Sequence, residues 1–162
     1  VVSKLESFIK NNSGKQASGE AALILSQIFQ DYKQSEKAAE VLGSAVQSLD
    51  KEGVLTAVMN MRAGDLFASS GNCEKAISFW QPISAQESFL KNQAQLKLSV
   101  CLQKVGRVDD AKAKLQAIES KAPNSAEGFN AKKYLRYIKF MDKVEPTEGK
   151  AKTENKESEN KS

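Results

Sequence analysis

The stretch Gly71-Asn-Cys-Glu-Lys-Ala76 decides the fold, because it recurs twice in related form. Gly106-Arg-Val-Asp-Asp-Ala111 repeats the pattern, and Lys33-Gln-Ser-Glu-Lys-Ala38 repeats it with lysine in place of the first glycine. Glycine suits the left-handed backbone that ends a helix, acidic side chains suit the positive N-terminus of the next helix, and alanine lets two helices approach closely. Each stretch therefore predicts a turn between two helices.

These turns also bring the flanking segments into register. Aligning Ala38, Ala76 and Ala111 gives spacings of 38 and 35 residues, close to the roughly 34 residues of a tetratricopeptide unit. Apolar residues then recur at four positions, namely Leu25, Ala63 and Leu98; Phe29, Phe67 and Leu102; Leu42, Trp80 and Leu115; and Ala45, Ile83 and Ile118, and small residues recur at a fifth, Ser26, Gly64 and Ser99. We expect these positions, Trp80 included, to form the core.

The repeated pattern resembles the tetratricopeptide repeat family over roughly residues 19–125. The resemblance implies an all-α protein, an α-solenoid of about three helix-turn-helix units. Flanking helices at about 3–11 and 126–142 are expected to cap it. Pro82 should end the second helix of the second unit early, because proline lacks an N–H group and clashes with the preceding turn.

Helical periodicity extends through most of the chain and then stops. A wide apolar stripe at helical spacing, which we expect to be buried, is formed by Leu23, Ile24, Ile28 and Phe29. From Lys143 onward the chain contains almost nothing apolar, which is the composition of a solvated segment. We therefore expect a helical domain over 1–142 and a disordered charged tail over 143–162.

Composition narrows the possible functions. The chain has 162 residues, no histidine and a formal net charge of +4. Without histidine, His-dependent catalytic triads, His-ligated zinc and the commonest general base at neutral pH are excluded. We expect no enzyme, no cofactor and no metal; two carboxylates clustered in a concave site would favour catalysis instead. With few arginines, the mild positive charge predicts no nucleic-acid partner.

The sequence alone does not fix whether Cys73 and Cys101 are free thiols or form a disulfide. They form no CxxC motif and lie on helices that should be neighbours. A disulfide is conceivable, but buried free cysteine is common, and we expect free thiols.

The resemblance also implies a binding face, because ligands of the family usually lie along the inner face formed by the first helix of each unit. The residues expected there are Leu23, Gln27, Val58, Met61, Arg62, Asp65, Leu96, Lys97 and Val100. Chaperone-binding members clamp a C-terminal carboxylate with several Lys, Arg and Asn side chains. At the matching positions this chain keeps only Arg62 and Lys97 as cations, too few for such a clamp.

An apolar groove with a polar rim is the better expectation for this face, suited to an amphipathic helix or an extended segment of a protein or peptide ligand. In the alternative, the flanking helices or a second copy in a homodimer cover the apolar residues.

A basic stripe runs along the expected last helix, with Lys132, Arg136, Lys139 and Lys143 at helical spacing. Tyr134, Tyr137 and Phe140 lie near it in sequence. Such a stripe could meet anionic lipid or RNA, but a capping helix must be polar outside, so an ordinary solvated face is expected.

The order of segments is similar to the family of tetratricopeptide-like domains typified by the ancillary subunit of the bacterial SecYEG translocon. The segments that carry this resemblance are Lys4–Ile9, Ala21–Ser26 and Met59–Gly64. It implies a periplasmic domain that helps newly exported proteins meet chaperones. It also implies an inner-membrane anchor upstream of Val1, the sole expected contact with the membrane. The alternatives are a structural adaptor in a cell-envelope or secretion assembly, which could self-associate, and a cytoplasmic location.

Overall fold

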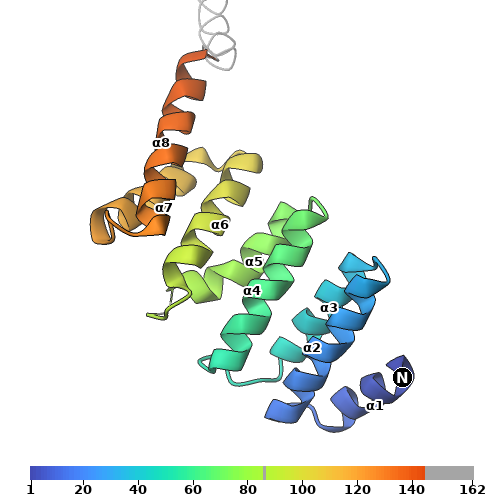
Figure 1. The fold of residues 1–162 in the computed structure, drawn as a ribbon. Helices are drawn as coiled ribbons and strands as arrows, with labels where there is room; N and C mark the ends of the chain where they lie inside the picture. The colour runs from blue at the N-terminus through green and yellow to red at the C-terminus, as the bar shows by residue number, and fades with distance from the viewer. Residues whose placement is uncertain (86, 145–162) are drawn as a thin grey trace, which may run out of the picture.

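The structure, a computed structural model, describes residues 1–85 and 87–144, which form eight helices and no strand (Figure 1). The helices are α1 (Val2–Asn11), α2 (Gln16–Asp31), α3 (Ser35–Val46), α4 (Val54–Ser69), α5 (Cys73–Ala85), α6 (Lys91–Lys104), α7 (Val108–Lys121) and α8 (Ala126–Val144). Each helix packs against the next one along the chain. The predicted all-α solenoid is confirmed, with α2–α3, α4–α5 and α6–α7 as the three units and α1 and α8 as the flanking helices.

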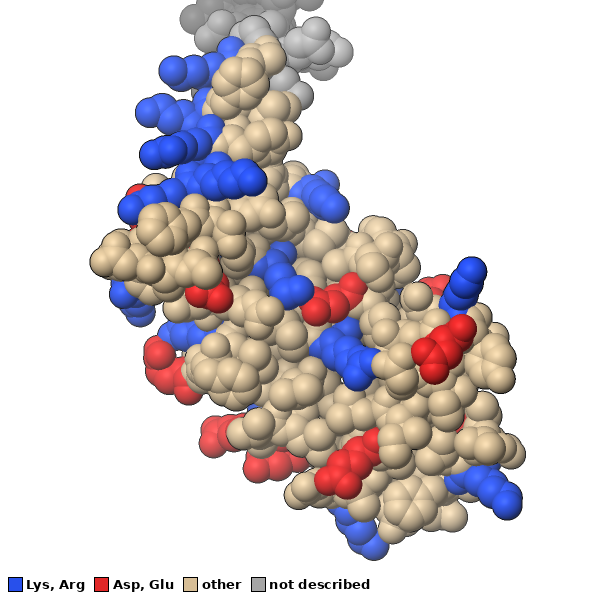
Figure 2. Space-filling model, in the orientation of Figure 1, with Lys and Arg blue, Asp and Glu red and all other residues tan. Residues whose placement is uncertain are grey.

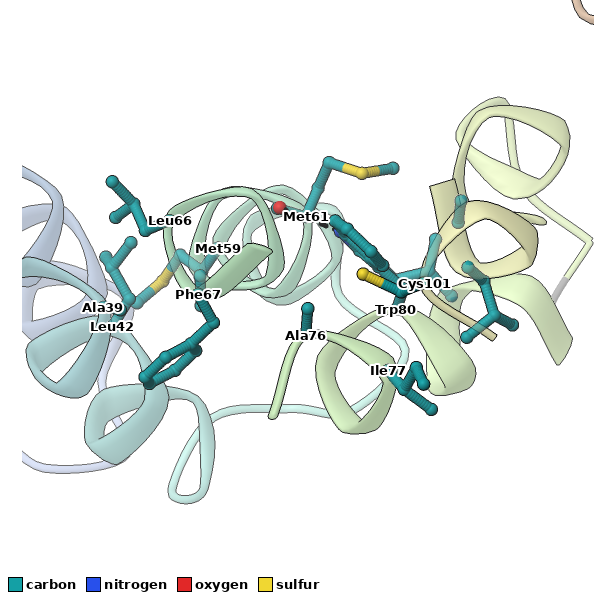
Figure 3. Close-up of a cluster of buried hydrophobic side chains, with 14 of the residues drawn as sticks. Ala39, Leu42, Met59, Met61, Leu66, Phe67, Ala76, Ile77, Trp80 and Cys101 are labelled. Atoms are coloured by element: carbon teal, nitrogen blue, oxygen red, sulfur yellow. Dashed lines mark hydrogen bonds between the residues drawn. The ribbon is translucent and has the colours of Figure 1, made fainter. Parts of the chain in front are cut away.

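The aligned positions form the core. All of them are buried except Phe29, which is half-buried. Trp80 lies between α4 and α5, where its indole N–H donates a hydrogen bond of 3.2 Å to the Met61 carbonyl (Figure 3). A Cβ atom on Gly64 would collide with the same indole ring. The small residue of the second unit is therefore what allows α4 to approach Trp80.

The turns inside the three units share one geometry. Gly71 and Gly106 have φ angles of 84° and 81°, and Lys33 adopts the same left-handed conformation with φ at 58°. In each turn the next backbone N–H donates a 2.8 Å hydrogen bond to a carbonyl five residues back, on Phe29, Phe67 or Leu102. This bond satisfies a carbonyl that the helix end leaves without an intrahelical partner.

The prediction for Pro82 is wrong. The helix α5 contains Pro82 and continues to Ala85. Because proline has no N–H group, α5 lacks one hydrogen bond, the one that residue 82 would donate to the Ser78 carbonyl four residues back. Ile83 and Ser84 are both buried, so packing holds the turn after the proline in helical form.

Ile24 also departs from its prediction, because 56% of it is exposed. The buried side of α2 is formed by small residues around Leu25, namely Ser18, Gly19, Ala21, Ala22 and Ser26. Neighbouring helices approach α2 on that side, which leaves Ile24 outside the contact. The apolar stripe of α2 is therefore wider than the side of the helix that is buried.

The two cysteines are paired in a disulfide, which corrects the expectation of free thiols. The bond joins the start of α5 to the end of α6, with the Cα atoms 5.1 Å apart. The two helices are neighbours, as expected, and their packing brings the two side chains within bonding distance, which the sequence does not fix.

The predicted tail at 143–162 lies outside the described residues except for its first two, which belong to α8. In the part of the chain that the structure describes, no helix combines the length and apolar character needed to cross a membrane.

Candidate functional site

The predicted binding face is crossed by polar side chains that join the first helices of successive units. Between α2 and α4, the Arg62 guanidinium donates a hydrogen bond to the amide oxygen of Gln27. The amide nitrogen of Gln27 donates in turn to the Asp31 carboxylate, at 2.8 Å. Four of the nine predicted site residues, Gln27, Arg62, Asp65 and Lys97, take part in such contacts between helices.

Between α4 and α6, the Lys97 ammonium donates to the Asp65 carboxylate at 2.8 Å. The same ammonium lies 5.9 Å from the centroid of the Trp80 ring, within the range of a cation–π contact. Arg62 and Lys97 are thus both bonded within the chain, so neither is free to clamp a carboxylate. Because the Asp65–Lys97 pair is partly exposed, it adds no more than about 1 kcal/mol to stability.

The apolar members of the predicted site do not all reach the surface. Met61 is buried, and Leu23 and Val100 are half-buried. Leu96 packs against the apolar cluster between α7 and α8, so the alternative that a flanking helix covers this face holds for Leu96. Val58 remains, with 38% of it exposed.

Two further apolar residues join Val58 on exposed surface and were missing from the predicted site. Val54 is 67% exposed and stands one turn before Val58 on α4, and Ile24 is exposed on α2. The spacing of Val54 and Val58 is the signal that could have identified the first of them. We call Ile24, Val54 and Val58 the exposed apolar triad.

A hollow that was not predicted lies between α1, α2 and α3. Its volume is about 650 Å³, and its apolar wall includes Leu25, Phe29 and Val41. Charged side chains of α1 and α3 stand at its rim, namely Glu6, Lys10, Lys37 and Glu40. The helix α1 contains no buried residue, and so it covers the first unit only shallowly.

The last helix is fixed to α7 by its inner side. Ile138 and Ala131 are buried there, and the Lys112 ammonium forms a 2.7 Å ion pair with the Asp142 carboxylate. That hydrogen bond raises the pKa of Lys112 above its usual range. Lys139 of the basic stripe lines a small hollow together with Lys112 and Asp142. Figure 2 shows a row of Lys and Arg side chains along α8, where the helix extends beyond the other helices.

Within the described residues, no group of three or more Cys, Asp or Glu side chains is placed to hold a metal ion. The described surfaces present apolar side chains beside polar side chains that are already paired. They therefore offer area for contact with another molecule. This arrangement can bind a polypeptide without any chemical step.

The fold defines the class: an α-solenoid of tetratricopeptide-like helix pairs. No protein-family model matches the chain, and no curated protein matches it. Among solved structures, the crystal structure of MamA, a protein that contains tetratricopeptide repeats, is similar over 88% of this chain and 87% of MamA. The TM-score is 0.57 and the sequence identity is 17%, a likeness that concerns the fold.

Proposed function

We propose that this protein is a non-enzymatic scaffold that binds a segment of another protein along α2, α4 and α6. The proposal is supported by the tetratricopeptide-like solenoid, in which successive helix pairs form an extended surface. It is carried by one observation, the exposed apolar triad beside the polar contacts that join these helices. Exposed apolar groups with a polar rim suit an amphipathic helix or an extended segment.

The buried core between the helices gives this surface its shape before a ligand arrives, and polar contacts join the helices at the surface. Gln27–Arg62 ties α2 to α4, and Asp65–Lys97 ties α4 to α6. A surface that needs no rearrangement loses less entropy on binding. The side chains that contact the ligand are then Ile24, Val54 and Val58, while the core packing holds the helices in place and the paired polar groups lie beside the contact surface.

The finer proposal is a periplasmic domain, anchored in the inner membrane, that helps exported proteins meet their chaperones. The Cys73–Cys101 disulfide supports it, because disulfides persist in the periplasm and are rare in the cytoplasm. The similarity in segment order to the SecYEG-associated domains supports it as well. A self-associating adaptor in the cell envelope is the other candidate.

Photocrosslinking in the native host tests both proposals. A photoreactive residue is placed at Ile24 or at Val58, which are exposed, rather than at the buried Met61. A matched control carries it at Ser44, which is exposed on α3 in the wall of the hollow between α1, α2 and α3. Adducts with translocon subunits or exported proteins from Ile24 and Val58, but not from Ser44, are expected.

Other adducts would point elsewhere. A single cell-envelope protein captured at all positions in fixed ratio would favour the adaptor. Adducts only with a second copy would show that self-association covers the face. Adducts from Ser44 alone would move the binding site to the hollow between α1 and α3.

A further inference from the structure

The outward side of α8 carries an aromatic stripe in addition to the predicted basic one. Phe129 and Phe140 are each 61% exposed, and Tyr137 and Val144 are more than half exposed. At about 100° per residue, Phe129, Phe140, Val144 and Tyr137 fall within about 80° of one another around the helix. Ile138 faces the opposite way, into α7, so the aromatic stripe is not part of the core.

Basic side chains flank this stripe. Lys132, Arg136, Lys139 and Lys143 lie along one side of it, and Lys133 falls within it. Two acidic side chains lie near these cations. Asp142 is paired with Lys112, and Glu119 of α7 lines a small hollow together with Lys139. On α8 itself, Glu127 and Asp142 fall on the packed half of the helix. The outward half and its edge therefore combine five cations with exposed phenyl rings, and Lys139 is the cation nearest to α7.

The shape of this surface indicates what it meets. Phe129 and Val144 are fifteen residues apart, which is about 22 Å along a straight helix. The surface is a convex ridge on a helix that extends beyond the others (Figure 1). A ridge of this kind fits a flat, deformable partner better than a peptide, which needs a groove.

The chemistry favours a lipid bilayer over a nucleic acid. Phenyl rings and a valine can enter the boundary between headgroups and acyl chains while lysines beside them meet anionic headgroups. Phe129 and Phe140 lie about 16 Å apart along the helix, too far to stack on neighbouring bases. The ridge has one arginine, whereas nucleic-acid surfaces usually cluster several.

We propose that the outward side of α8 is a docking surface for anionic lipid bilayers, with Phe129 and Phe140 inserting and the five cations binding headgroups. Such docking would lay the C-terminal end of the solenoid on a membrane and leave α2, α4 and α6 free for a protein ligand. It does not depend on the function proposed above.

Vesicle sedimentation with the full chain tests the electrostatic part. We expect binding to phosphatidylcholine vesicles containing roughly a third phosphatidylglycerol, and little to pure phosphatidylcholine. Lys132→Gln/Arg136→Gln/Lys139→Gln should weaken binding roughly hundred-fold, because each basic residue near the surface contributes about a five-fold factor. Lys4→Gln/Lys10→Gln/Lys15→Gln removes the same charge from the opposite end of the solenoid and should change binding little.

A fluorescent residue tests insertion. In Phe140→Trp, emission should shift to the blue with anionic vesicles and be quenched by spin-labelled lipid, while the parent chain, with Trp80 buried, should show neither change. Phe129→Ser/Phe140→Ser should retain native circular dichroism but bind at least ten-fold more weakly.

Three results would overturn the proposal. Equal loss of binding in the two triple-glutamine variants would show diffuse attraction to net charge. Anionic vesicles that fail to bind a folded chain would exclude the lipid partner. Tighter binding to single-stranded RNA or to an acidic polypeptide, unaffected by Phe129→Ser/Phe140→Ser, would assign the basic residues to a different polyanion.

Discussion

Lys33 occupies a backbone position that the other two units give to glycine. Its φ angle of 58° lies close to those of Gly71 and Gly106, and the turns form equivalent hydrogen bonds. A side chain in this left-handed conformation costs about 1–2 kcal/mol. The first unit thus keeps the geometry of the turn despite an unfavourable residue, because helices on both sides of the turn are packed.

Lys33→Gly should therefore raise the free energy of unfolding by about 0.5–1 kcal/mol, since relief of the strain exceeds the added entropy of the unfolded chain. Urea denaturation measures the change. Gly106→Lys is the converse control and should lower stability by a similar amount, because nothing lies within 4 Å of a Cβ there and only the backbone resists it. Destabilisation by Lys33→Gly would mean that the lysine side chain itself stabilises the turn.

At the scale of the helix, the disulfide makes α5 and α6 a covalent pair. Cys73 begins α5 and Cys101 lies near the end of α6, with a sequence separation of 28. Both cysteines are buried in the main core cluster, next to helices that also contact each other. The bond closes the loop that contains Pro82 and the connection to α6, and so it restricts the unfolded chain most in this region.

Cys73→Ala/Cys101→Ala should lower the free energy of unfolding by about 2–4 kcal/mol, the range for closing a loop of this length. Chemical denaturation with and without reductant is the measurement: reductant should destabilise the parent chain and leave the variant unchanged. Titration of free thiols in the unfolded parent provides the check, and two reactive thiols without reductant would contradict the bond.

At the scale of the molecule, the hydrophobic interior of residues 1–85 and 87–144 is divided into two clusters. The larger one extends from α2 to α6 and includes Ala111 at the start of α7, and the smaller one joins α7 and α8 around Leu115, Ile118 and Ile138. Most helix contacts are between neighbours along the chain. In such a solenoid stability is close to a sum over units and their interfaces, so the C-terminal end can open while the rest stays folded.

Ile138→Ala should destabilise this end by about 2–4 kcal/mol, the cost of truncating a fully buried isoleucine. In native-state hydrogen exchange, amides of α7 and α8 should exchange faster while those of α2 and α3 keep their rates. Leu42→Ala in the larger cluster is the matched control and should have the reverse pattern. Faster exchange throughout the chain in both variants would show a single cooperative unit.

The sequence predicted the helix pairs with their core because these depend on local patterning. Aligned alanines and glycines marked the turns, and the residues aligned with them are buried in each unit except for Phe29, which is half-buried. The candidate site was predicted less well. The repeat indicates which helices form the expected face. It does not reveal that Met61 is buried or that Val54 is exposed, because exposure depends on how closely neighbouring helices approach.

What the sequence alone determined was the fold class, the order of the three units and the flanking helices, since apolar spacing and turn residues act within one or two helices. Tertiary structure alone decided the pairing of Cys73 with Cys101, the helical turn after Pro82, the Gln27–Arg62 and Asp65–Lys97 contacts and the exposure of the aromatic stripe on α8. Each depends on side chains from different helices, or on the side of a helix left without a neighbour. Only the packing of the whole solenoid fixes these distances.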